Sequence, residues 1–69
     1  MMNITTTSDG FLLDEKTYKF INETPSEVIN EDQVHVYTDL GIILLDLSCT
    51  INEIDYTDIN LFLLALKGE

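Results

Sequence analysis

Apolar and polar residues alternate with the two-residue period of β-strands in the first third of the chain. The pattern predicts a short edge strand over residues 2–8 and a second strand over residues 11–21, which breaks at residues 14–15. Between the two strands stands Asp9-Gly10, a dipeptide that type I′ hairpin turns prefer because both residues tolerate positive φ angles. This part of the chain therefore predicts a β-hairpin with a third strand segment.

A short helix is predicted to follow the hairpin, because Thr24-Pro25-Ser26-Glu27 has the pattern of a helix start. Thr24 suits the N-cap, and Pro25 suits the first helical position, where no N–H is needed. Glu27 at the third position completes a capping box. About two turns fit before the polar residues 30–32 end the helix.

A second hairpin is predicted from residues 33–38 and 42–49, joined by a three-residue loop with Gly41 in the left-handed region. With that loop, the even-numbered residues of both strands share one face and the odd-numbered residues share the other. Both faces are then largely apolar. The hairpin, with Leu44 in it, is predicted to be the core of the protein.

The carboxyl end has the 3.6-residue period of a helix from Thr57 or Asp58 to Lys67, with Gly68 as a stop. One apolar stripe faces the core, and further apolar residues cover much of the rest: Ile59, Phe62, Leu63 and Leu66 form the stripe, and Leu61, Leu64 and Ala65 flank it. A second possible capping box over residues 50–53 leaves open a start near residue 51.

These elements predict an α+β fold for residues 1–69 as one domain. It has a small antiparallel sheet of about four strands in two hairpins, a short helix between them, and a C-terminal helix packed on the sheet. The apolar surface exceeds what one small domain can cover, which predicts a homodimer. We expect its interface at Leu61, Leu64 and Ala65 of the C-terminal helix, or along strand 42–47.

The charge of the chain limits the kinds of ligand and partner that we expect it to bind. It has 13 Asp and Glu against 3 Lys and Arg, a net charge of -10 on 69 residues, and yet 45% of it is hydrophobic. A chain this apolar should fold and display its acids on a fixed surface. A net charge of about 2 to 8 normally suffices for solubility. The negative charge beyond this range disfavours nucleic acid and anionic membranes as ligands and predicts a basic partner.

Few residues of this chain are of the types that act in catalysis. His35 on a strand and Cys49 at the end of a strand are best explained as packed side chains, and residues 55–60 lack the alternating acids, central glycine and closing Glu of a calcium loop. We therefore expect no enzyme, no metal and no cofactor. The amino end lacks the pattern of a signal peptide and no apolar run reaches about 18 residues, so we expect the cytoplasm as location, in a host cell if a phage encodes the protein.

In size, charge and lack of catalytic residues, the chain resembles the small acidic proteins with which phages block host nucleic-acid-binding machinery, DNA mimics and anti-CRISPR proteins among them. The resemblance is one of general character and implies a non-catalytic inhibitor that occupies a basic cleft. The acids expected to bind the partner are Glu23, Glu27, Glu31, Asp32, Glu53, Asp55 and Asp58. The alternative is a homodimeric interaction or regulatory module whose acids serve only solubility.

Overall fold

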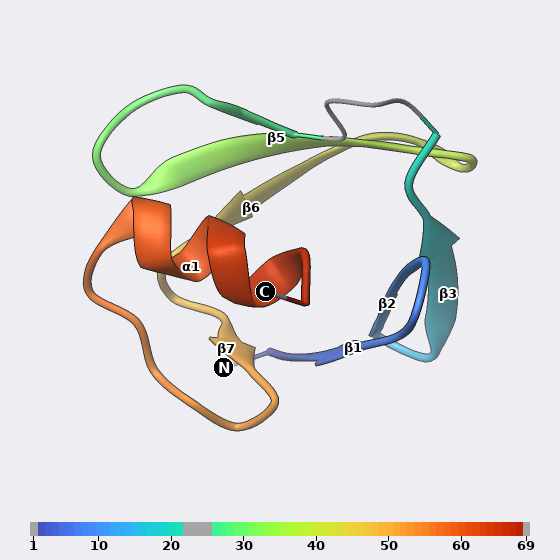
Figure 1. The fold of residues 1–69 in the computed structure, drawn as a ribbon, viewed down its shortest axis with the longest axis horizontal. Helices are drawn as coiled ribbons and strands as arrows, with labels where there is room; N and C mark the ends of the chain where they lie inside the picture. Colours follow the sequence, from blue (N-terminus) through green and yellow to red (C-terminus); the bar gives the residue numbers. More distant parts are fainter. Residues whose placement is uncertain (1, 22–25, 69) are drawn as a thin grey trace.

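Two β-sheets and one helix form the part of the protein that the computed structural model describes, residues 2–21 and 26–68. The sheets have the strand orders β3-β2-β1-β7 and β4-β5-β6, and α1 lies between them (Figure 1). The elements are β1 (Asn3–Thr6), β2 (Gly10–Leu13), β3 (Lys16–Lys19), β4 (Ser26–Val28), β5 (Gln33–Thr38), β6 (Gly41–Asp46), β7 (Thr50–Ile51) and α1 (Ile59–Leu66). The predicted α+β class is confirmed, whereas the single sheet of about four strands is wrong.

The first strand, β1, is an inner strand of its sheet, contrary to the predicted edge position. It pairs antiparallel with β2 and parallel with β7, so the sheet is not purely antiparallel. The Asn52 side chain, directly after β7, links β7 to β1. Its Oδ1 accepts from the Thr6 N–H at 3.1 Å, and its Nδ2 donates to Thr6 Oγ1 at 3.0 Å. These bonds join residues 46 positions apart, which local sequence patterns do not indicate.

The turns of the first sheet differ from the predicted type I′ turn at Asp9-Gly10. Ser8 and Asp9 are the central residues, because the Thr7 N–H donates to Gly10 O at 3.0 Å, and neither of them has a positive φ. Gly10 belongs to β2, where a Cβ atom would lie 1.8 Å from the Tyr18 carbonyl oxygen. The positive φ angles typical of a type I′ turn occur instead at the predicted break, in residues 14 and 15.

The short helix predicted to start at Thr24 and to end before residues 30–32 is wrong where the structure describes it. Residues 26–28 are the strand β4, and Glu27 pairs with His35 of β5 instead of completing a capping box. Thr24 and Pro25, the predicted cap and first helical residue, lie outside the described residues. Pairing with a neighbouring strand outweighs a local helix signal of this length, because a helix of about two turns is marginal without tertiary support.

The second hairpin forms as predicted but with its register shifted by one residue. Thr38 pairs with Gly41, so the loop has two residues, 39 and 40, instead of three. The Thr38 hydroxyl supports this tight turn by donating to Gly41 O at 2.6 Å and accepting from the Leu40 N–H at 3.2 Å. A shift of one residue exchanges the faces of one strand relative to the other.

The core follows from this register. Val34 and Val36 of β5 are fully buried opposite Leu45 and Ile43, whereas Leu44, predicted as core, is 53% exposed. The buried apolar residues are Ile4, Phe11, Leu13, Val34, Val36, Leu45, Cys49, Ile51, Ile59, Phe62 and Leu66. They come from both sheets and from α1, so the helix closes the core between the two sheets (Figure 1).

The C-terminal helix confirms the predicted start at Asp58. Asp58 is the N-cap, and its carboxylate accepts hydrogen bonds from the N–H groups of Asn60 at 2.8 Å and Leu61 at 3.2 Å. Gly68, with φ +82°, follows the C-cap Lys67 as predicted. The alternative start near residue 51 is wrong, because residues 50–51 form β7.

Candidate functional site

Acidic residues gather at the end of the molecule where the β4–β5 loop meets the start of α1, at the left of Figure 1. A shallow depression of about 620 Å³ lies there, lined by Asn30, Glu31, Asp32, Leu47 and Thr57. Asp58 directly follows Thr57, and Asp46 directly precedes Leu47. We call Glu31, Asp32, Asp46 and Asp58 the acidic end.

The loop between β4 and β5 presents two of these acids to solvent. Asn30 shapes the loop, because its Oδ1 accepts from the Asp32 N–H at 3.0 Å and its Nδ2 donates to Gln33 Oε1 at 2.7 Å. The Leu47 N–H donates to Asp32 O at 3.1 Å and ties the loop to the chain that leaves β6. Glu31 and Asp32 are exposed, and their side chains therefore project from a loop that is hydrogen-bonded at its base.

The other two acids of this end are fixed by local hydrogen bonds. Ser48 donates to Asp46 Oδ1 from its hydroxyl and from its N–H, the latter at 2.9 Å, and these bonds lower the pKa of Asp46. Asp58 holds the first turn of α1 as the N-cap. Both carboxylates thus have set positions.

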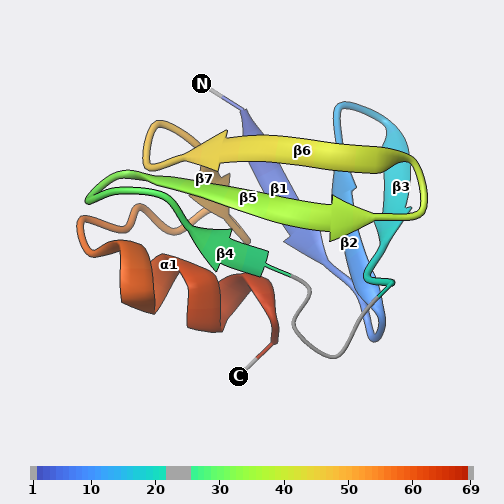
Figure 2. The same ribbon diagram turned by 90° about the horizontal axis from the view of Figure 1, so that it is seen from above.

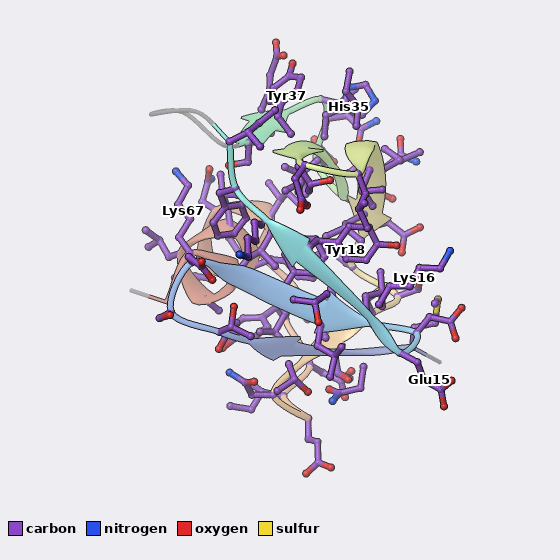
Figure 3. The ribbon with its side chains drawn as sticks, turned by 90° about the vertical axis from the view of Figure 1, so that its right-hand side faces the viewer. Glu15, Lys16, Tyr18, His35, Tyr37 and Lys67 are labelled. Carbon is purple, nitrogen blue, oxygen red and sulfur yellow. The ribbon has the colours of Figure 1, made fainter. Side chains whose placement is uncertain are left out.

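The positive side chains of the protein lie away from the acidic end. Lys16 and Lys19 are the first and last residues of β3, and Lys67 follows the last turn of α1. Figure 3 looks at the end opposite to the acidic one and shows Lys16 and Lys67 at its two sides. The lysines of the described part of the chain therefore lie outside the acidic end, whereas acidic residues also occur elsewhere, among them Asp14 and Glu15 directly before Lys16.

The predicted partner-binding acids do not form a single surface. Glu31 and Asp32 line the depression at the acidic end, and Asp58 directly follows its lining residue Thr57. Asp55 is an exposed residue of the segment that leads to α1. Glu53 lies in the turn after β7, where its N–H donates to Asn3 Oδ1 at 2.8 Å. Glu23 lies outside the described residues.

Glu27 belongs to a different surface, the outer face of the three-stranded sheet. The Tyr37 hydroxyl donates to Glu27 Oε2 at 2.8 Å, and this hydrogen bond, together with the negative charge of Glu27, raises the pKa of Tyr37. Figure 3 shows Tyr37 and His35 side by side on this face. Ile42 and Leu44 of β6 lie on the same face, opposite Tyr37 and His35.

Sequence patterns missed this outer face, because the predicted loop was one residue too long. With the observed pairing, Tyr37, Ile42 and Leu44 share a face, and Ile42 and Leu44 are 63% and 53% exposed. The sequence feature that could have indicated the shorter loop is Thr38 before Asp39-Leu40-Gly41, because its hydroxyl can close a two-residue loop.

The predicted dimer residues on α1 differ in their surroundings. Leu61 and Leu64 are exposed, whereas Ala65 is half-buried and packs against the core. The helix therefore presents two of the three residues to solvent.

Cys49 and His35, the two residues considered for catalysis, do not come together in the structure. Cys49 is buried in the core, and His35 lies on the outer face of the three-stranded sheet, so the two cannot act as nucleophile and base. Residues 2–21 and 26–68 hold no group of three or more His, Cys, Asp or Glu side chains that could bind a metal ion. In these same residues, no helix has the length and apolar character needed to span a bilayer.

Comparison of the chain with protein-family models, with curated proteins and with solved structures gives no match.

Proposed function

We propose that the protein is a non-catalytic inhibitor that binds a basic, nucleic-acid-binding cleft of another protein with its acidic end. One observation carries the proposal: Glu31 and Asp32 line a depression at one end of the molecule, Asp46 and Asp58 directly adjoin two of its other lining residues in the sequence, and no lysine lines it. Charges that served solubility alone would not require an end that gathers acids and excludes lysines. A one-signed end attracts a surface of opposite sign and orients the approach.

The size and charge of the protein suit competition with nucleic acid. Duplex DNA carries one charge per about 1.7 Å of its axis, so a net charge of -10 equals that of about five base pairs. The protein measures 26 × 23 × 19 Å, which is comparable with the length of such a segment. A groove rich in Lys and Arg would release counterions on binding either ligand, and occupation by this protein would exclude the nucleic acid.

The experiment compares two charge-reversed variants as baits in a bacterial lysate, with mass spectrometry of the retained proteins. One variant combines Glu31→Lys and Asp32→Lys with Asp58→Asn, which removes the charge at that position but keeps a residue that caps helices well. The matched control combines Asp9→Lys and Glu15→Lys, two exposed acids in the turns on either side of β2, far from the acidic end. Circular dichroism confirms that both variants fold.

We expect the wild type and the control to retain a basic nucleic-acid-binding protein, and the acidic-end variant to lose it. Duplex DNA should release the retained protein, because both ligands use the same groove. Equal retention by both variants would contradict the proposal, as would retention unchanged at about 0.5 M salt, where the Debye length is under about 5 Å. Either result would favour the alternative, an interaction module whose acids serve solubility.

A further inference from the structure

The strand β6 forms a sheet edge that differs from the other three edges of the fold. In the first sheet, β3 carries Lys16 and Lys19 at its ends, and β7 has two residues. In the second sheet, β4 has three residues and contacts α1. In contrast, β6 is six residues long, and its sequence is GIILLD. Short strands, lysines and covering elements protect edges from pairing, and β6 has none of these features as far as residues 2–21 and 26–68 show.

The backbone groups of β6 that point away from the sheet can be assigned from the ladder. The Leu47 N–H donates to Asp32 O at 3.1 Å, one step beyond the pairs of β5 and β6. Bonded and non-bonded pairs alternate in an antiparallel ladder, so Gly41, Ile43 and Leu45 direct their backbone groups to β5. Ile42 and Leu44 therefore present theirs at the open edge, as does the Asp46 N–H, whereas Asp46 O already accepts from the Cys49 N–H at 3.2 Å.

The side chains at this edge are apolar as well. Leu40, Ile42 and Leu44 are 60%, 63% and 53% exposed. Figure 2 shows β6 along one border of the molecule, with β5 as its neighbour on the other side. An exposed apolar strand with unpaired backbone groups is a surface on which a further strand can pair.

We propose that the occupant of this edge is β6 of a second copy of the chain, paired antiparallel about a twofold axis into a continuous six-stranded sheet. Side chains that are paired across the twofold axis must point to the same side of the sheet. The axis must therefore pass through a residue of β6 and not between two residues. With Ile43 on the axis, Ile42 pairs with Leu44 of the second copy. In this register Asp46 falls opposite Leu40 of the loop, beyond the end of the strand. With Leu44 on the axis, Ile42 within the strand would face the ionised Asp46 of the second copy, which makes the first register the better one.

Charge supports a second copy in this orientation, although each copy carries a net charge of -10. Asp46 is the one charged residue of β6, so this edge repels a second copy less than surfaces with more acids do. An antiparallel pair places the two acidic ends at opposite ends of the shared strands. In the proposed register the two Asp46 residues are about 20 Å apart at about 3.4 Å per residue, more than two Debye lengths at physiological salt.

The test measures the molecular mass by sedimentation equilibrium from about 1 µM to about 1 mM at physiological salt. We expect a monomer–dimer equilibrium for the wild type, and for Leu44→Lys a dissociation constant raised about 30-fold or more, as for loss of a central interface residue. The matched control is Leu61→Lys on α1, which introduces the same charge at a position of similar exposure, 56% against 53%. We expect this control to dimerise like the wild type.

Hydrogen exchange of the wild type gives a second measurement that needs no substitution. The N–H groups of Ile42 and Leu44 should exchange slowly at about 1 mM and quickly at about 1 µM, because only a paired edge protects them. A wild type that stays monomeric up to about 1 mM would overturn the proposal and leave the edge to a strand of another protein. A dimer that Leu61→Lys disrupts and Leu44→Lys does not, or whose edge amides exchange quickly, would equally overturn it.

Discussion

Leu44 and Leu45 are neighbours on β6 whose truncation tests the register of the central hairpin. The Leu45 side chain is 3% exposed and pairs with Val34 on the core side, whereas Leu44 is 53% exposed and pairs with His35 on the outer face. We expect Leu45→Ala to lower the free energy of unfolding by about 3 to 5 kcal/mol. The same change at Leu44 should cost about 1 kcal/mol or less.

The two magnitudes follow from burial. Truncating leucine to alanine removes three carbon groups, each contributing about 0.8 kcal/mol when fully buried, or about 2.4 kcal/mol together. At Leu45 a cavity term adds to this, because the surrounding core relaxes only in part. At Leu44 about half of the side chain already contacts water, and no enclosed cavity forms. A 69-residue domain has roughly 3.5 to 10 kcal/mol of stability in total, so the Leu45 variant should be close to unfolding.

Urea denaturation followed by far-ultraviolet circular dichroism measures both variants, at a protein concentration that keeps them monomeric. The chain has no tryptophan, and the backbone signal reports unfolding without an added probe. The slope of the free energy against urea should stay constant, so that a shift of the midpoint reads as a change in stability. A larger loss for Leu44→Ala than for Leu45→Ala would refute the reasoning, because it would place the even-numbered residues of β6 in the core.

Substitutions at three further positions have expected outcomes. Asp58→Ala should cost about 1 kcal/mol and speed hydrogen exchange in the first turn of α1, while Asp58→Asn should leave both nearly unchanged, since Asn also caps helices. Ser48→Ala should raise the pKa of Asp46, measured by carboxyl NMR titration, because it removes one of two donors. A carboxylate whose pKa is lowered in the folded state stabilises the protein at pH values above its ordinary pKa, and this stabilisation is lost as the pH falls through the lowered pKa. The Ser48→Ala variant should therefore be less stable than the wild type near neutral pH, and its free energy of unfolding should fall less on acidification. Gly10→Ala should abolish the folded dichroism spectrum or the thermal transition, since its Cβ would lie 1.8 Å from Tyr18 O; a melting temperature like that of the wild type would contradict this expectation.

The C-terminal helix is the element that sequence patterns predicted best. Its cap, its apolar stripe and its glycine stop are local signals, and each acts within a few residues of its position. Phe62 and Gly68 take the predicted roles of core residue and stop, and Asp58, predicted as a possible first residue of the helix, is its N-cap. Such signals need no knowledge of the rest of the fold.

The helix predicted around Glu27 failed for the opposite reason. A capping box stabilises a helix start by about 1 kcal/mol, which pairing with a neighbouring strand can outweigh. The partner strand β5 supplies three pairs to residues 26–28. Whether a partner strand is in place depends on the whole fold, and no pattern within the segment reports it.

The candidate site was predictable in its residue types and not in its arrangement. The charge of -10 and the acids Glu31, Asp32 and Asp58 are visible in the sequence. Their meeting at one end depends on the β4–β5 loop lying beside the segment that enters α1, since both line one depression. Glu27 illustrates the limit, because its position on a strand places it on the outer face beside Tyr37.

The sequence by itself determined the α+β class, the hairpin segments, the C-terminal helix and the strong negative charge, since periodicity, capping and composition are local or additive properties. Tertiary structure decided the division into two sheets, the parallel pairing of β1 with β7, and the hairpin register. These features depend on contacts between distant residues and on the length of a single loop. A one-residue difference in that loop moved Leu44 from the predicted core to the open edge, because side chains alternate between faces with a period of two.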